Sequence, residues 1–255
     1  MTPAVTPPSA TMNRTLYALH RWISLAILAQ FSVWLGSGLF FASFPIAEVR
    51  GEHTETSSPL ETNDGAALLS AATALGVVAQ LGFGAVEALE LRSVAGRPVY
   101  IARGPHHASV RLDARSGALL PVERAEAEII ARRDQRGEPT VSDAQLVVEN
   151  PPIEYRDRPL PAWRVLLADS AGTAVWVDAR SGEVTARRND RWRQYDFLWS
   201  LHIMDYRQRE SFHHPLLIAA ALLGLLTIAS GAALWILRFL RWRRRRSAVE
   251  ATEPS

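Results

Sequence analysis

Two long apolar segments stand out in the pattern of hydrophobic and polar positions along the chain. The first is the uncharged run from Trp22 to Phe44, and the second is the uncharged run from Pro215 to Leu237. Each has 23 residues, whereas a helix needs about 20 apolar residues to cross a bilayer core. A cleavable signal peptide is the alternative for the first run, but its apolar region would hold only about 7–15 residues. The pattern predicts two transmembrane helices, at residues 15–45 and 215–240.

Basic residues next to these runs predict their orientation. Six arginines lie within Arg238–Arg246, directly after the second run, and Arg14 and Arg21 precede the uncharged part of the first. Positively charged flanks stay on the cytoplasmic side of a membrane. We therefore expect cytoplasmic tails at residues 1–14 and 241–255. The intervening part of the chain is expected in the periplasm of a bacterial cell, with the helices in its inner membrane.

A third uncharged stretch, Ala66–Val86, is the one competitor to this two-span topology. It is rich in alanine, contains serine, threonine and glutamine, and is only weakly apolar. Its composition favours a buried amphipathic helix over a third span.

The pentapeptide Asp-Ala-Arg-Ser-Gly occurs twice, at Asp113–Gly117 and at Asp178–Gly182. Short β-rich runs bounded by turn residues precede each copy, and a helix-like stretch precedes those runs. The pattern predicts an α+β domain built from a duplicated unit of one helix and about three antiparallel strands, at residues 62–121 and 122–188. We expect the pentapeptide to be a turn, because Asp accepts backbone N–H groups and Gly adopts the left-handed conformation. A catalytic Asp is the alternative, but the two copies share no His partner at a matching position.

These features resemble a known family. The strand that ends in an Asp-x-x-x-Gly turn is similar to the PepSY module, and Leu19–Trp22 (LHRW) and Trp199–Tyr206 (WSLHIMDY) resemble the two His-bearing segments of the PepSY-associated transmembrane family. Many members have four spans, whereas this chain has two. The resemblance implies a bacterial inner-membrane protein tied to iron acquisition, in some members a haem-bearing reductase of ferric siderophores. Isolated PepSY modules are instead associated with inhibiting or chaperoning peptidases.

Four of the seven histidines lie on or near the predicted spans. His20 is at the inner end of the first span, and His202 is in residues 191–212, which we expect to form an interfacial amphipathic segment. His213 and His214 are at the outer end of the second span. Histidine is rare within membranes and usually has a function there, and its nitrogens ligate haem iron. These four are the candidate ligands of haem b. The alternative is an interfacial role for His20 and His202, and solvation at the N-terminus of a helix for His213 and His214.

No metal other than haem iron is expected, and no catalytic residue is assigned. The three remaining histidines are expected to be exposed in loops. They are His53, His106 and His107.

Geometry limits how these histidines can share an iron. Two axial nitrogens on one iron are about 4 Å apart, whereas His20 and His214 lie on opposite faces of a core about 30 Å thick. An iron with two histidine ligands therefore needs His202 with His213 or His214, or His20 from two chains. A homodimer would supply four helices, and such bundles hold haem between facing helices. Gly36, Ser37 and Gly38 would allow the close approach.

Composition narrows the function further. The net charge of +2 gives no support to nucleic-acid binding, and the absence of cysteine excludes disulfides and Cys-ligated clusters. No dinucleotide-binding fingerprint is present, so electrons would come from a quinol or a redox partner protein. We expect a haem-binding electron-transfer component that reduces ferric iron or a ferric siderophore in the periplasm. The alternative is a membrane-anchored binding module without haem (a peptidase inhibitor, chaperone or transporter accessory) that holds its partner through a sheet edge or face.

Overall fold

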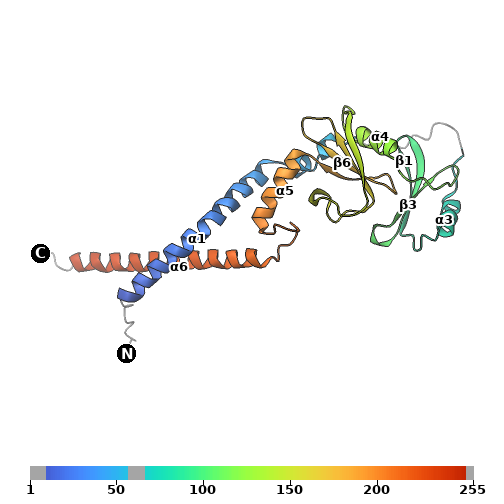
Figure 1. Ribbon diagram of the computed structural model, residues 1–255. Coiled ribbons are helices and arrows are strands. Elements are labelled where there is room, and N and C mark those ends of the chain that lie inside the picture. The colour runs from blue at the N-terminus through green and yellow to red at the C-terminus, as the bar shows by residue number, and fades with distance from the viewer. Residues whose placement is uncertain (1–9, 57–66, 251–255) are drawn as a thin grey trace. The chain divides into compact units, whose positions relative to one another are not determined.

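The computed structural model describes residues 10–56 and 67–250 of the protein (Figure 1). The chain divides into two compact units. We call residues 1–43 and 196–255 the helical unit, and residues 44–195 the sheet unit. The architecture is α+β, as predicted, with two antiparallel sheets and a long apolar helix towards each end of the chain.

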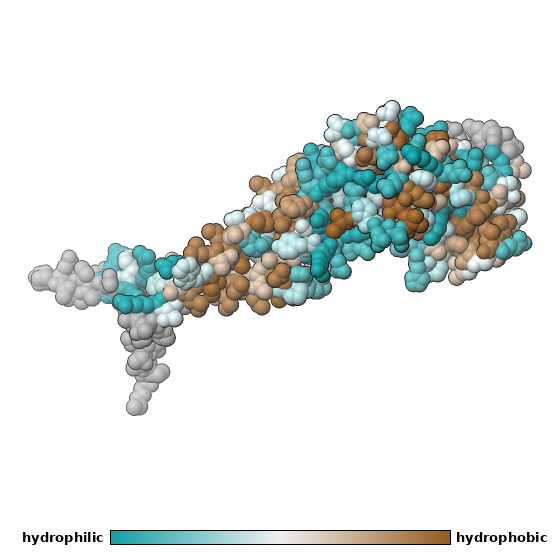
Figure 2. Space-filling model, viewed as in Figure 1, coloured by the Kyte–Doolittle hydropathy of each residue, from teal (hydrophilic) through white to brown (hydrophobic). Residues whose placement is uncertain are grey.

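Two long helices form most of the helical unit. They are α1 (Ala10–Ser43) and α6 (Pro215–Glu250). Within them, residues 17–43 and 215–244 are long and apolar enough to cross a membrane, and only 11% of each apolar window is buried within the chain. Figure 2 shows hydrophobic side chains gathered on the surface of both helices. The predicted pair of apolar helices is confirmed, and their surfaces suit a lipid or protein environment.

Glycines on α6 set the packing between these helices (Figure 1). A Cβ atom added to Gly224 would lie 3.0 Å from the Phe31 ring, and one added to Gly231 would lie 3.1 Å from Cε1 of His20. Large side chains of α1 therefore occupy the space that the glycines of α6 leave open. Small residues at helix contacts are the usual means of close approach between membrane helices.

The first half of the sheet unit is one helix on a three-stranded antiparallel sheet of order β1-β2-β3. Its elements are α3 (Ala71–Gln80), β1 (Ala88–Val94), β2 (Arg97–Arg103) and β3 (Ser109–Asp113). The hydroxyl of Ser70 accepts the Thr73 N–H and caps α3. Ala74 and Val78 are fully buried against this sheet. Within the weakly apolar stretch Ala66–Val86, whose first residue lies outside the described residues, the helix is α3. It has ten residues and is too short to span a bilayer.

The second half repeats this plan with one more regular strand. Its elements are α4 (Arg124–Asp134), β4 (Val141–Val147), β5 (Ala162–Leu167), β6 (Ala174–Asp178) and β7 (Val184–Arg188), and the strand order is β4-β5-β6-β7. The extra strand follows the second pentapeptide. After the first pentapeptide the chain forms only an isolated bridge between Leu112 and Leu119. Each half thus has one helix and one antiparallel sheet, with three strands in the first half and four in the second.

Short helices connect these elements, and α5 (Asp190–Ile203) begins in the sheet unit and ends in the helical unit. The short helices are α2 (Ile46–Val49), η1 (Glu52–Thr54), η2 (Pro105–His107) and η3 (Ile153–Tyr155).

Both pentapeptides form the same turn at the end of a strand. Asp113 Oδ1 accepts backbone N–H groups two and three residues ahead at 3.0 and 2.9 Å, and Asp178 Oδ1 does so at 2.8 and 2.7 Å. Gly117 and Gly182 close the turns with φ of 73° and 77°. The N–H of Ser116 contributes most to holding the pKa of Asp113 below its ordinary value. The interpretation of the repeated string as a structural turn is confirmed.

The two halves share one core. Val99 and Ile101 of β2 are fully buried in a cluster that also contains Ala127 of α4. Beside that cluster, the fully buried Arg111 of β3 donates to Glu126 of α4 at 2.7 Å. Breaking one partner of such a buried pair is strongly destabilising. The sheet unit is therefore a single packed body.

Candidate functional site

His202 of α5 lies against α1 within the helical unit. Its Nδ1 is 2.7 Å from the hydroxyl of Ser37, and its ring contacts Phe41 with 5.4 Å between centroids. The indole N–H of Trp34 donates to the His202 carbonyl at 2.8 Å, and Gln30 donates to the Leu201 carbonyl at 3.4 Å. These α1 side chains satisfy carbonyls that the end of α5 would otherwise leave unpaired. The last turn of α5 is thus bound to the apolar stretch of α1.

The side chain of His20, a residue of α1, lies at the contact between α1 and α6. Its Nδ1 is 2.7 Å from the hydroxyl of Ser230 on α6, and its ring fills the space beside Gly231. Ser24, one turn further along α1, has a buried hydroxyl with no hydrogen-bond partner among the residues that the structure describes.

A serine hydroxyl lies against Nδ1 of each ring and also against a carbonyl of its own helix. Ser37 Oγ is 2.7 Å from the Val33 carbonyl, and Ser230 Oγ is 3.0 Å from the Thr227 carbonyl. A serine hydroxyl has one proton and two acceptor lone pairs, so a serine that donates to its carbonyl accepts from the histidine Nδ1–H. That arrangement leaves the Nε2 lone pair able to ligate a metal, and Nε2 of both rings has no hydrogen-bond partner in the described part of the chain.

The two histidine sites are separate. His20 and Ser37 are 17 residues apart on α1, which corresponds to about 25 Å at a rise of 1.5 Å per residue. Since axial nitrogens on one iron are about 4 Å apart, His20 and His202 of one chain cannot share an iron.

The other candidate histidines are arranged differently. Nδ1 of His214 accepts the Leu216 N–H at 3.4 Å, and its carbonyl accepts N–H groups of the first turn of α6. A ring that accepts at Nδ1 carries its proton on Nε2 when neutral, so His214 acts as a helix cap. The backbone N–H of His213 donates to Ser211, and its side chain is exposed. The geometry therefore gives the His214 ring a capping role and leaves the His213 ring exposed.

The three loop histidines lie in the sheet unit. His53, His106 and His107 are all exposed, as expected. His106 and His107 have φ of 56° and 63° and form the tight connection between β2 and β3.

Two buried aspartates, Asp205 and Asp196, hold the loop that joins α5 to α6. Asp205 is 4% exposed and accepts four backbone N–H groups, from Arg207 and Gln208 on one oxygen and from Glu210 and Ser211 on the other. Burial alone would raise the pKa of Asp205, but these N–H groups lower it well below the ordinary value. Asp196 of α5, also buried, forms an ion pair with Arg209 of the same loop at 2.5 Å. The loop is therefore anchored to the helix that carries His202.

Both histidine sites fit a haem group. Each offers an imidazole whose Nε2 has no hydrogen-bond partner among the described residues, and a serine at Nδ1 orients the ring as outer partners orient metal-ligating histidines. Apolar side chains elsewhere on α1 are exposed, among them Trp22 at 63%, Leu35 at 76% and Leu39 at 70%. Lipid or a second chain can cover such side chains.

Sequence reasoning missed Ser230 as a partner of His20, and considered Ser37 only as a small residue for helix approach. A signal was present, because polar residues within apolar spans usually have a partner. In both spans the serine directly precedes a glycine, Gly38 or Gly231.

Comparison of the chain with protein-family models, with curated proteins and with solved structures finds no match.

Proposed function

We propose that this chain is a haem-binding electron-transfer protein of the PepSY-associated transmembrane type. Helices α1 and α6 would anchor it in a bacterial inner membrane, with both termini cytoplasmic. The observation that carries the proposal is the pair of contacts that join Ser230 Oγ to Nδ1 of His20 and Ser37 Oγ to Nδ1 of His202, each at 2.7 Å. His20 of α1 and His202 of α5 would thereby be oriented to ligate through Nε2.

The positions on α1 place the sites at different depths. His20 lies two residues before the uncharged run that starts at Trp22, and Ser37 lies 15 residues into that run. At 1.5 Å per residue, Ser37 is about 22 Å into a core about 30 Å thick. Under the proposed topology, His20 serves the cytoplasmic side and His202 serves the periplasmic half.

A second ligand completes each site. At the inner site it is His20 of a second copy, because the described residues bring no other histidine near His20 in one chain. At the outer site it is His213 of the same chain or His202 of the second copy. The proposed assembly is a homodimer whose four long helices enclose the haem.

When bound, haem supplies an iron that takes up and releases one electron. The residues of the chain orient and enclose this group. Ser230 and Ser37 hold the imidazoles in the ligating tautomer, the apolar faces of α1 and α6 exclude water, and the loop around Asp205 anchors the end of α5. A quinol or redox partner protein is the electron donor, and ferric iron or a ferric siderophore in the periplasm is the acceptor.

The test is electron transfer from the reduced protein. The full chain, purified in detergent with ample haem supply, is reduced anaerobically with dithionite, freed of excess reductant and mixed with ferric citrate. We expect the ferrous α band to disappear as a ferrous-iron chelator develops colour in equal electron equivalents. Buffer containing a redox-inert gallium citrate is the matched control. A reduced band that persists equally with iron and gallium would contradict the proposed function.

A further inference from the structure

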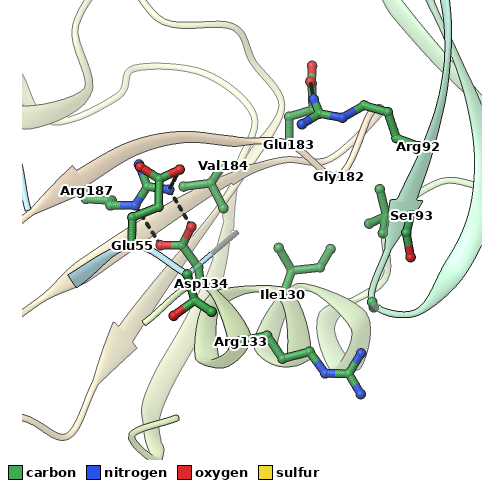
Figure 3. Close-up of a pocket in the computed structure, with 13 residues that line it drawn as sticks. Glu55, Arg92, Ser93, Ile130, Arg133, Asp134, Gly182, Glu183, Val184 and Arg187 are labelled. Atoms are coloured by element: carbon green, nitrogen blue, oxygen red, sulfur yellow. Dashed lines mark hydrogen bonds and ion pairs between the residues drawn. The ribbon is translucent and has the colours of Figure 1, made fainter. Parts of the chain in front are cut away.

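The sheet unit contains a cleft of about 290 Å³ that the haem proposal does not use. Figure 3 shows β1 on one side of it, and α4 and the start of β7 on the other. Val94, Ile130 and Val184 contribute apolar surface between these walls. The cleft is therefore lined by both halves of the sheet unit.

Strand β1 presents a free backbone edge. It pairs only with β2, through a two-residue turn at Ala95 and Gly96 that makes Val94 and Arg97 a hydrogen-bonded pair. Inward hydrogen bonds then alternate along β1. Ser93 therefore directs its N–H and carbonyl away from β2. This agrees with its partner in the pairing, because Ser93 faces Pro98 and proline has no N–H to donate.

The same alternation directs the backbone groups of Leu89 and Leu91 outward. None of these outward groups has a hydrogen-bond partner within residues 10–56 and 67–250. The other edge of this sheet differs, because the Arg111 carbonyl of β3 accepts the Leu120 N–H. Within this sheet the free edge is therefore that of β1, whose residues Arg92, Ser93 and Val94 line the cleft.

Most charges in the cleft neutralise one another. Arg187 is bound to Asp134 and, at 3.1 Å, to Glu55, as the dashed lines in Figure 3 show. Arg92 is bound to Glu183 on the opposite side. The carboxylates of the cleft are therefore already paired with arginines.

Arg133 is the exception among the charged residues that line the cleft. It extends from α4 (Figure 3) and has no acidic partner in the described ranges. Its Nη1 lies 3.3 Å from the position that a Cβ on Gly96 would take, so the guanidinium lies over the turn that ends β1. The hydroxyl of Ser93, nearby on β1, also has no partner there. One unpaired cation beside a free strand edge complements an extended acidic segment.

We propose that this cleft binds an extended peptide segment that carries a carboxylate. The segment adds to the edge of β1 through the outward N–H and carbonyl groups, and its carboxylate pairs with Arg133. An apolar side chain of the segment packs on Ile130 and Val184. The occupant is an acidic strand of a partner protein, and this inference is independent of haem.

Binding is measured by fluorescence anisotropy on the full chain in detergent. The probe is a fluorescein-labelled, end-blocked peptide Thr-Val-Asp-Val-Thr-Val, and its comparisons carry Asn or Lys in place of Asp. We expect saturable binding of the Asp peptide, with about tenfold weaker binding of the Asn peptide and none of the Lys peptide. Arg133→Gln should remove the preference for Asp over Asn. Arg136→Gln, which removes a charge just outside the cleft, should preserve it.

Ser93→Pro tests the strand edge separately. Because the N–H of Ser93 points outward, proline at this position removes no hydrogen bond within the sheet, and the thermal unfolding midpoint should stay within a few degrees. We expect Ser93→Pro to abolish binding of all the peptides. If Ser93→Pro disturbs the fold, the proposal is tested instead by comparing the preference for the Asp peptide in Arg133→Gln and in Arg136→Gln.

Two outcomes would overturn the proposal. One is equal affinity for the Asp, Asn and Lys peptides, or no saturable binding. The other is occupation of the edge by β1 of a second copy, which the single cysteine of a Ser93→Cys variant would reveal by efficient disulfide cross-linking, since the chain has no cysteine of its own.

Discussion

Replacing Ser37 with alanine removes the hydroxyl that contacts Nδ1 of His202 while leaving the histidine itself in place. The contact is 2.7 Å long, and Ser37 is 2% exposed. Without it, Nδ1 of His202 loses its hydrogen-bond partner and the ring loses a constraint on its orientation. Haem retention should therefore fall even though no ligand has been changed.

The expected size of this effect follows from two independent magnitudes. A buried donor left unpaired costs about 1–3 kcal/mol. Loss of an outer-shell partner of a metal-ligating histidine lowers metal affinity about 10–100-fold, which corresponds to about 1.4–2.8 kcal/mol. The two ranges agree, so we expect haem affinity at the outer site to fall between tenfold and a hundredfold.

Ser32→Ala is the matched control. Ser32 lies on the same helix and donates to the Leu28 carbonyl at 3.0 Å, as Ser37 donates to Val33, but it touches no histidine. Haem dissociation from the ferric form is followed by transfer to excess apomyoglobin, with loss of the Soret band of each variant as the readout. Equal dissociation from Ser32→Ala and Ser37→Ala would refute the role assigned to the serine.

Three further predictions concern other contacts. Gly231→Val should displace the His20 ring, which would lie 3.1 Å from the new Cβ, and lower the haem content measured as the pyridine haemochrome. Arg111→Ala should lower the free energy of unfolding by about 3 kcal/mol in urea titrations followed by tryptophan fluorescence, because it leaves the Glu126 carboxylate without its buried partner. Asp205→Asn should lower the thermal unfolding midpoint at neutral pH. Since the pKa of Asp205 is lowered by folding, its stabilisation is present above the unfolded pKa of about 4 and lost as the pH falls through the folded value. The difference from the wild type should therefore shrink below pH 4, and a constant difference would contradict the reasoning.

Sequence reasoning predicted the elements that depend on local pattern. The two 23-residue uncharged runs became α1 and α6 because length and composition alone determine such helices. The turns at Asp113 and Asp178 were predictable because the side chain, the N–H groups and the glycine lie within five residues.

Contacts between distant segments were not predictable in the same way. Ser230 is 210 residues from His20, and Ser37 is 165 residues from His202. Nothing local in the sequence pairs such residues. The ion pair between Arg209 and Asp196 is closer in sequence, but Arg209 has a left-handed backbone conformation, with φ of 60°, that no sequence pattern indicates. Candidate ligands could therefore be found from residue type and position, whereas their orientation required the fold.

The most direct test of the account is the absorbance spectrum of the detergent-purified full chain before and after dithionite, for the wild type and for His20→Ala, His202→Ala and His214→Ala. The account predicts a sharp Soret band with resolved α and β bands on reduction, and haem content that falls for His20→Ala and His202→Ala but not for His214→Ala. A featureless wild-type spectrum after expression with ample haem supply would contradict the central claim and leave the membrane-anchored binding module as the function of this chain.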